Sequence, residues 1–402
     1  MGAKHPPYQI NSDGGDIEVT AVFESLLTEE QRLLRDTARE FAEKRLYPHA
    51  EAFDQAQGIP DGLLKEMAEL GYFALTIPEE YGGMGIDAVS YALVLEEFSR
   101  ACAGLGIMVS VQNTLVSGAI TRFGTEEQKK QWLPRLAAGE LGAYALTEPD
   151  AGTDAAAIQL AATDGGDCYV LNGAKTFITS AGLAKLFLVF ARTDPKGGSH
   201  GITAVVLDRD TPGFEVGKPE HKLGIRASDT RALSFTDARV PKSNRLGAEG
   251  QGFKIALSQL DYGRLGVAAQ ALGIGEAAYA EARKYAKVRQ QFGQPIAQFQ
   301  AVGFKLADMK VKLDAARLLL DRAIRKLMTG ERFTLEAAEA KLFASEAANW
   351  VANEAVQIHG GYGYMKEYAV ERYFRDARIT EIYEGTSEAQ RIVISRAILA
   401  EE

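Results

Sequence analysis

Residues 186–207 read LFLVFARTDPKGGSHGITAVVL, and this stretch decides the fold class of the middle of the chain. Two short apolar runs, 186–191 and 202–207, are separated by a segment that contains Pro195 and Gly197. Short runs rich in β-branched and aromatic residues, broken by Gly and Pro, are typical of strands and turns. The same texture extends over residues 141–247, so we expect a β-sandwich or β-barrel domain there.

Helical periodicity flanks this β region on both sides. In residues 25–140, Thr28 with Gln31 and Thr125 with Gln128 match the capping box that begins a helix. In residues 248–402 the pattern predicts a four-helix bundle with helices at 255–288, 299–328, 335–359 and 387–400. Residues 1–24 are expected to form an N-terminal extension. The fold class is therefore α+β and multidomain, and the lack of βαβ alternation argues against a nicotinamide-dependent dehydrogenase.

The composition is that of an ordinary globular protein, with 46% hydrophobic and 25% charged residues in 402. A formal net charge of -9 argues against nucleic acid as a partner. Cys102 and Cys168 are far apart and lack metal-type spacing, which favours a reducing, cytoplasmic location without a metal site. The apolar stretch 103–120 is interrupted by Gln112, so we expect a buried core helix there, with no membrane span or targeting signal.

One short glycine pattern resembles a dinucleotide-binding fingerprint. Residues 83–88, GMGIDA, match G-x-G-x-x-A, but the residues before them, 78–81, have the pattern of a loop and not of a strand. A Gly-rich turn between two helices is the better interpretation.

Two longer motifs carry the chemistry. Residues 144–154, YALTEPDAGTD, leave a strand through Pro149 and Gly152, and such a loop could bind a flavin ring or a phosphate or be an ordinary turn. Residues 357–364, QIHGGYGY, read on their own as a flexible turn after a helix. Together they resemble the two signature sequences of the acyl-CoA dehydrogenase family, and the resemblance extends from about residue 27 to the C-terminal helices.

The resemblance implies FAD as cofactor, in a fold with an N-terminal α-helical domain, a middle β domain and a C-terminal helical bundle. In residues 175–182, KTFITSAG, it implies that Phe177 lies near the flavin ring and that Thr179 hydrogen-bonds it. It further implies that Arg289, Gln291, Phe292 and Gln300 contact the cofactor of a neighbouring subunit, so the active unit is at least a dimer and is expected to be a tetramer. The other cofactor-binding residues implied are Tyr144, Leu146, Thr147, Gly152, Thr153, Ile178, Gln357, Ile358, Gly360, Gly361, Thr386 and Glu388.

Glu384 lies in the run IYEGT, residues 382–386, directly before the last predicted helix. Ser387 and Gln390 match a capping box, which would place Glu384 beside free backbone amides. A single Glu in that place is ordinarily a surface residue that favours the helix dipole. The resemblance implies instead that Glu384 is the base that removes the α-proton of an acyl-CoA, because Gly263 stands where isovaleryl and long-chain members carry theirs. The other carboxylates nearby are Glu367, Asp376 and Glu381.

The implied activity is α,β-dehydrogenation of an acyl-CoA to a trans-2-enoyl-CoA, with electrons passed to an electron-transferring flavoprotein. The C-terminal sequence is similar to the short-chain, butyryl-type branch, while Ser258 in place of a bulkier Gln keeps medium or branched chains open. Alternatives are an acyl-CoA oxidase, a decarboxylating glutaryl-type dehydrogenase and a non-catalytic CoA- or flavin-binding module. The substrate-binding residues implied are Thr153, Asp261, Arg264, Tyr383 and Gly385.

Overall fold

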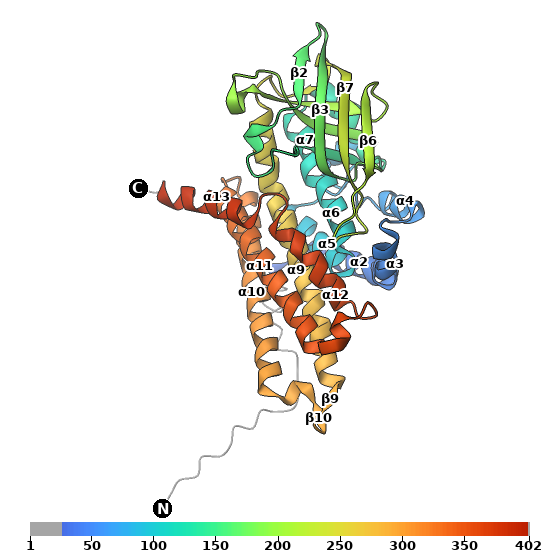
Figure 1. Ribbon diagram of the computed structural model, residues 1–402, viewed down its shortest axis with the longest axis vertical. Helices are drawn as coiled ribbons and strands as arrows, with labels where there is room; N and C mark the ends of the chain where they lie inside the picture. Colours follow the sequence, from blue (N-terminus) through green and yellow to red (C-terminus); the bar gives the residue numbers. More distant parts are fainter. Residues whose placement is uncertain (1–25, 401–402) are drawn as a thin grey trace, which may run out of the picture.

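The computed structural model describes residues 26–400 and shows helices, a β-sheet and helices again in chain order (Figure 1). The predicted extension, residues 1–24, lies outside the described residues. The first helical part contains α2 (Glu29–Phe41), α3 (Ala50–Ala56), α4 (Asp61–Glu69), α5 (Ala88–Ala101), α6 (Ala103–Ser110), α7 (Gly118–Phe123) and α8 (Glu126–Ala137). Thr28 and Thr125 each form the predicted capping box, with Gln31 and Gln128 respectively.

Residues 103–123 form the most apolar helical stretch of the described chain. By length and composition this stretch could cross a membrane, but residues 103–120 are all buried inside the protein. The prediction of a core helix is confirmed, and the sheet and the long C-terminal helices pack around it.

The middle part is one eight-stranded sheet. Its strands are β1 (Gly142–Ala145), β2 (Ala161–Asp164), β3 (Cys168–Thr179), β4 (Leu186–Arg192), β5 (Ile202–Asp208), β6 (Phe214–Pro219), β7 (Thr230–Pro241) and β8 (Arg245–Leu246). The order is β6-β7-β3-β2-β4-β5-β8, and β1 pairs in parallel with β4. Leu188 and Phe190 of β4 belong to the core shared with the helices, whereas Phe187 and Val189 belong to a separate core on the other face. The strands β4 and β5 are therefore buried on both faces, which explains their continuous apolar runs.

The C-terminal part consists of α9 (Gly252–Val288), α10 (Gln300–Met328), α11 (Thr334–His359), α12 (Val370–Arg378) and α13 (Ser387–Leu399). The three long helices α9, α10 and α11 pack side by side, and a short hairpin of β9 (Gln290–Gln291) and β10 (Gln294–Pro295) ends the bundle (Figure 1).

The helix predicted at 387–400 is present, but the prediction that it is the fourth helix of the bundle was wrong. The segment 387–400 is helical, but α13 contacts α11 and then extends sideways from the bundle (Figure 1). The shorter α12, which was not predicted, packs against both α9 and α11. The reason is the distribution of apolar surface: α12 buries Val370, Tyr373 and Ala377 at helical spacing, whereas the buried residues of α13 are the polar Ser387 and Gln390.

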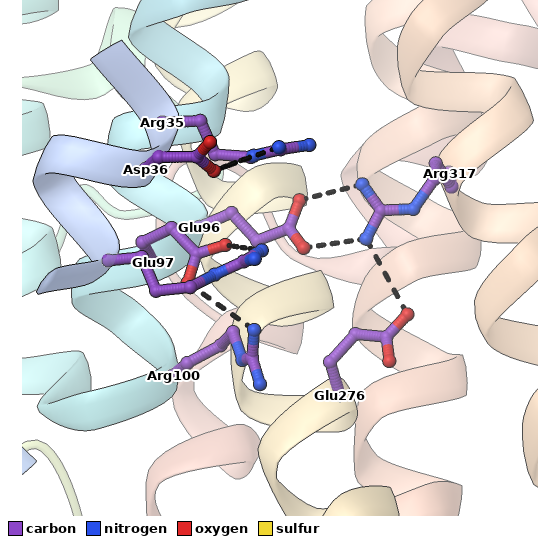
Figure 2. A network of polar contacts seen from close by, with 8 residues as sticks. Arg35, Asp36, Glu96, Glu97, Arg100, Glu276 and Arg317 are labelled. Carbon is purple, nitrogen blue, oxygen red and sulfur yellow. Dashed lines mark hydrogen bonds and ion pairs between the residues drawn. The ribbon is translucent and has the colours of Figure 1, made fainter. Parts of the chain in front are cut away.

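A buried polar network holds the long helices in register (Figure 2). Arg317 of α10 donates to both carboxylate oxygens of Glu96 on α5, at 2.9 and 2.6 Å, and lies 3.5 Å from Glu276 of α9. Glu97, the next residue of α5, accepts from Arg39 of α2 at 2.7 Å. Since bidentate guanidinium–carboxylate pairs fix geometry as well as charge, this network sets how α5, α9 and α10 lie relative to one another.

Candidate active site

A cavity of about 570 Å³ lies where the sheet meets the C-terminal helices. Loops after β1 and residues at the end of β3 form one wall, and the turn between α12 and α13 forms another. The predicted site residues that line it are Thr147, Gly152, Thr153, Phe177, Thr179, Tyr383, Glu384, Gly385 and Thr386. Segments more than two hundred residues apart in the sequence are thus brought to one space.

The loop after β1 is held by a buried lysine. The Nζ of Lys175 donates to a carboxylate oxygen of Glu148 at 2.7 Å and to the carbonyl of Leu146 at 2.9 Å. Glu148 also accepts from the backbone amide of Leu160 at 3.0 Å. Burial lowers the pKa of Lys175 to about 8, while Glu148 acts in the opposite direction. The pair fixes the loop that carries Thr147 and Thr153.

Replacing Lys175 with Met is expected to destabilise the protein by about 3 kcal/mol, because the buried carboxylate of Glu148 loses its cation. The loop should loosen as well, so the purified variant should carry less flavin. The measurements are chemical denaturation and the ratio of flavin to protein absorbance. The control is Lys242→Met, which removes a 2.7 Å pair with the exposed Asp164 and should change stability far less, because water screens an exposed ion pair. Equal effects of the two substitutions would contradict the role of Lys175.

Phe177 points toward the cavity because β3 is irregular at this point. The pairing of β3 with β7 shifts register between Lys175 and Ile178, and Phe177 has a φ of 58°. The bulge leaves the phenyl ring 66% exposed, while Ile178 is buried. Plain strand alternation would have placed Phe177 and Thr179 on one face; the bulge breaks that alternation, yet both residues line the cavity.

Three predicted cofactor-binding residues have their side chains in the core instead of on the cavity. Tyr144, Leu146 and Ile178 are each less than a tenth exposed. The hydroxyl of Tyr144 donates to the carbonyl of Ala256 on α9 at 3.2 Å. Tyr144 and Leu146 belong to the core shared by the sheet and the helices, whereas Ile178 belongs to the separate core on the other face of the sheet. Any contact of these residues with a ligand in the cavity would come from their backbones.

Glu384 occupies the turn between α12 and α13 in a strained backbone conformation. Its φ is 51°, in the left-handed region, and Gly385 follows with a φ of 93°. The residue as a whole is partly exposed, but both carboxylate oxygens are buried and have no hydrogen-bond partner in the described part of the chain. Burial raises the pKa of Glu384 to about 7, and the positive charges of Lys341 and Arg264 oppose that rise. The geometry holds a carboxylate that gains and loses a proton near neutral pH.

The capping box predicted for Ser387 and Gln390 is wrong. Ser387 is the first residue of α13 and not its N-cap; Thr386 is the N-cap, and its hydroxyl accepts from the amide of Ala389 at 3.2 Å. Gln390 instead donates from Nε2 to the carbonyls of Glu384 and Gly385, at 3.2 and 2.8 Å. Gln390 therefore supports the turn that carries the carboxylate.

A glycine on α9 makes room for that carboxylate. A Cβ at Gly263 would lie 1.8 Å from Oε2 of Glu384, so any larger residue there would displace the carboxylate from its observed position. Arg264, the next residue, pairs with Asp261 at 2.6 Å, as the spacing predicted, and both are largely buried. Burial raises the pKa of Asp261, and it lowers the pKa of Arg264. Neither residue lines the cavity.

A loop before β7 forms a further wall of the cavity that the sequence did not indicate. Lys222, Leu223, Gly224 and Ile225 line the space together with Arg375 of α12. The backbone amide of Ile225, whose φ is 44°, donates to the buried carboxylate of Asp376 at 2.5 Å. Burial raises the pKa of Asp376 to about 6. Asp376 thus holds the loop.

Lys341 of α11 is the other residue near Glu384 that was not predicted. Its side chain is fully buried, and its Nζ donates to the carbonyl of Gly385 at 2.7 Å. A signal was present in the sequence, because Lys341 falls at helical spacing among Ala337, Ala344 and Ala348. A lysine on an apolar helical face indicates a buried cation.

The remaining predicted residues gather at the opposite end of the bundle. Arg289, Gln291, Ile358, Gly360 and Gly361 line a second cavity of about 450 Å³ beside the β9–β10 hairpin, far from the sheet (Figure 1). Three others, Phe292, which is 92% exposed, Gln300 and Gln357, are exposed at the same end of the bundle. Glu388 is exposed elsewhere, at the start of α13. One chain therefore carries two separate groups of predicted cofactor-binding residues.

Comparisons with known proteins cover nearly the whole chain. Profiles of the N-terminal, middle and C-terminal domains of acyl-CoA dehydrogenase match residues 28–140, 143–238 and 250–399. A protein described as acyl-CoA dehydrogenase, short-chain specific, from Clostridium acetobutylicum is 48% identical over 92% of this chain and 98% of its own length.

Solved structures agree with these matches. Butyryl-CoA dehydrogenase from Megasphaera elsdenii superposes with a TM-score of 0.91 at 49% identity, covering 93% of this chain and 99% of that one. A chain in a structure described as electron transferring flavoprotein of Acidaminococcus fermentans has a TM-score of 0.92 at 50% identity, with the same coverage. The resemblance that the two motifs indicated is confirmed, and so is the predicted order of helical, β and helical domains.

Proposed function

Because the chain belongs to the acyl-CoA dehydrogenase family of FAD-dependent oxidoreductases, we propose that it desaturates a short-chain acyl-CoA with Glu384 as the base. The observation that carries the proposal is the buried carboxylate of Glu384, which lines the cavity, has no hydrogen-bond partner among the described residues and has a pKa of about 7. A carboxylate in that state is suited to accept a proton at neutral pH.

The residues of the larger cavity fit the cofactor of this family. Thr147, Thr153 and Thr179 bring hydroxyl groups to its wall, and the exposed ring of Phe177 offers a face for stacking. The hydroxyl of Ser387 is buried at the N-terminus of α13 without a partner in the described chain, next to free backbone amides. We assign the isoalloxazine end of FAD to this cavity. When bound, FAD accepts the hydride that leaves the β-carbon of the substrate.

The chain's own residues handle the α-proton. The bond between the α-carbon and its pro-R hydrogen breaks, the proton passes to a carboxylate oxygen of Glu384, and the α,β double bond forms as the β-hydrogen leaves with its electron pair. The backbone amide of Glu384 would hold the developing negative charge on the thioester oxygen, as the family resemblance implies. The product is a trans-2-enoyl-CoA.

The second group of residues serves the cofactor of another copy of the chain. Arg289 and Gln291 lie at the far end of α9 from Glu384, and Phe292 is almost fully exposed in the single chain. The guanidinium of Arg289 would pair with the pyrophosphate of FAD held by a neighbour. We therefore propose a homo-oligomer, at least a dimer and in full a tetramer. The apolar Ile392, Ile398 and Leu399 of α13 are exposed in the single chain and would be covered by such an assembly.

Two further assignments complete the proposal. The reduced enzyme passes its electrons to an electron-transferring flavoprotein, as the name of one similar structure suggests. The site of action is the cytoplasm, and this is supported by the two cysteines, Cys102 and Cys168, which are buried and unpaired as expected in a reducing compartment.

Anaerobic titration of the purified flavoprotein with acyl-CoAs of increasing chain length tests the function. We expect bleaching of the flavin band to be fastest with the four-carbon substrate, since the similar proteins are named for short-chain and butyryl substrates. Faster bleaching with medium or branched chains would correct the substrate, and no bleaching with any acyl-CoA would contradict the function. Admitting air after bleaching distinguishes an oxidase, which would regain its colour at once.

The pH dependence of the reaction should report Glu384. Because the ionised carboxylate is the base and its pKa is about 7, kcat/KM should rise with pH through about 7 and level off above it. The measurement is kcat/KM for butyryl-CoA between pH 5 and 9. A rate already constant at pH 5 would show that the base has an ordinary carboxylate pKa and does not lie in this buried site.

A further inference from the structure

One face of α11 carries three polar side chains that all reach the segment holding Glu384. Lys341, Ser345 and Asn349 are spaced by four residues and so share a face of the helix. Each of them donates a hydrogen bond to a backbone carbonyl of the segment 377–385. The acceptors, in the same order, are the carbonyls of Gly385, Thr380 and Ala377 at 2.7, 3.0 and 2.9 Å. The turn before α13 is therefore fastened to α11 over two helical turns.

Of these three side chains, only that of Lys341 is charged. Its side chain is fully buried, and within the described residues no carboxylate lies close enough to form an ion pair with it. Lys175, the other fully buried lysine among residues 26–400, has Glu148 at 2.7 Å. A buried ammonium without a counter-ion costs several kcal/mol in an apolar interior. A neutral hydrogen-bond donor at this position could hold the turn without that cost. The positive charge of Lys341 therefore needs an explanation beyond the hydrogen bond.

The ammonium of Lys341 donates to the carbonyl of Gly385, and Glu384 is the residue directly before Gly385. The carboxylate of Glu384 is therefore the charged group closest along the chain to this hydrogen bond. Groups on three other elements and on the turn itself also surround this carboxylate. From α9 comes Arg264, which is already paired with Asp261 at 2.6 Å. From β1, α5 and the turn itself come Tyr144, Tyr91 and Tyr383, which burial keeps neutral by raising their pKa values. In the described chain, Lys341 is thus the cation near Glu384 that forms no ion pair of its own, although the more distant carboxylates of Glu381 and Glu388 also favour its charged form.

We infer that Lys341 is a positioning residue for the base: its ammonium fixes the carbonyl of Gly385 and stabilises the ionised form of Glu384 across the turn. The inference rests on the proposed function, since it concerns how Glu384 is kept ready to accept a proton. Together with Arg264, this cation offsets part of the cost of burying the carboxylate of Glu384, which keeps Glu384 available as a base at neutral pH. Without the cation, Glu384 would hold its proton to higher pH and would be a base in a smaller fraction of molecules.

Two substitutions separate the charge of Lys341 from its hydrogen bond. Lys341→Gln keeps a donor but no charge, and Lys341→Met removes both. In both variants the rise of kcat/KM with pH should move upward by about one pH unit relative to the wild type. At pH 6 the loss should therefore be about tenfold, and it should shrink toward pH 9 for Lys341→Gln. Lys341→Arg, which keeps the charge, should restore the position of the rise.

Ser345→Ala is the matched control on the same face of α11. It removes one fastening bond, 3.0 Å long, without changing any charge, so it should lower the rate to a similar extent at every pH. The flavin content of each variant, read from its visible spectrum, shows that the fold and the cofactor are retained. If the pH profiles of Lys341→Gln and wild type coincide, or if Ser345→Ala shifts its profile as far, the inference is overturned.

The same experiment distinguishes this inference from the proposed function. Glu384→Gln is measured in parallel on butyryl-CoA. If that variant bleaches as fast as wild type, Glu384 is not the base and both statements fall. If it is inactive while the profile of Lys341→Gln stays in place, Glu384 remains the base and Lys341 alone is excluded. A shifted profile for Lys341→Gln, with an inactive Glu384→Gln, supports both.

Discussion

Replacing Glu384 with Gln should slow bleaching of the flavin by butyryl-CoA by about 10²- to 10⁴-fold, the range over which a positioned general base accelerates proton transfer. The substitution keeps the shape of the side chain and removes only its ability to take the proton. Binding of FAD and of acyl-CoA should persist, because Thr147, Phe177 and Thr179 are untouched. Stopped-flow absorbance under anaerobic conditions measures the effect.

The stability of Glu384→Gln provides its control. In the wild type the pKa of Glu384 rises from 4.5 in the unfolded chain to about 7 in the folded one. The wild type therefore loses stability as pH rises from about 4.5 to about 7, and the loss is complete above that range. The variant lacks this titration, so its unfolding temperature should match that of the wild type at pH 4.5 and exceed it at pH 8. A variant that is inactive and also less stable at pH 8 would point to misfolding instead of a lost base.

Gly263→Ala should have the second largest effect. Its Cβ would lie 1.8 Å from Oε2 of Glu384, so the carboxylate must move away. A displacement of about 1 Å in a catalytic group can cost about 100-fold in rate, and we expect a loss of at least that size in the bleaching rate. Flavin content should be unchanged, because Gly263 does not line the cavity.

A matched substitution tests whether the loss comes from this contact. Gly303 in α10 is also a helical glycine, and a Cβ there would have its nearest neighbour at 3.9 Å, the carbonyl of Ala297. Gly303→Ala should leave the rate unchanged and stabilise the helix slightly. Wild-type activity in Gly263→Ala would mean that the carboxylate has room to relocate, and it would weaken the assignment of Gly263 as its partner.

The domain order could be predicted from the sequence because it depends on local periodicity. The alternation of short apolar runs around β4 and β5 and the capping boxes at Thr28 and Thr125 are local signals, and the structure has all of them. Helix packing is not local. The sideways direction of α13 depends on which apolar side chains find a surface to cover, and the sequence of the helix by itself does not contain that surface.

The candidate site was predictable only in part for the same reason. The motif around Glu384 is a continuous run of residues, so its position could be read directly from the sequence. The support of Glu384 comes from segments that meet it only in the fold: Lys341 from α11, Gly263 from α9 and the loop that Asp376 holds. The bulge that turns Phe177 toward the cavity depends on pairing with β7, which strand alternation alone does not contain.

The length of α9 implies that cofactor binding would depend on the concentration of the protein itself. This helix of 37 residues spans about 55 Å, and it separates the cavity of Glu384 from Arg289 at its far end. On the proposal that Arg289 serves a neighbour, no single copy holds both halves of a cofactor site. FAD then binds assembled protomers better than separate ones, so by mass action cofactor loading and association promote each other. Newly made chains would stay colourless and inactive until their concentration allowed them to pair.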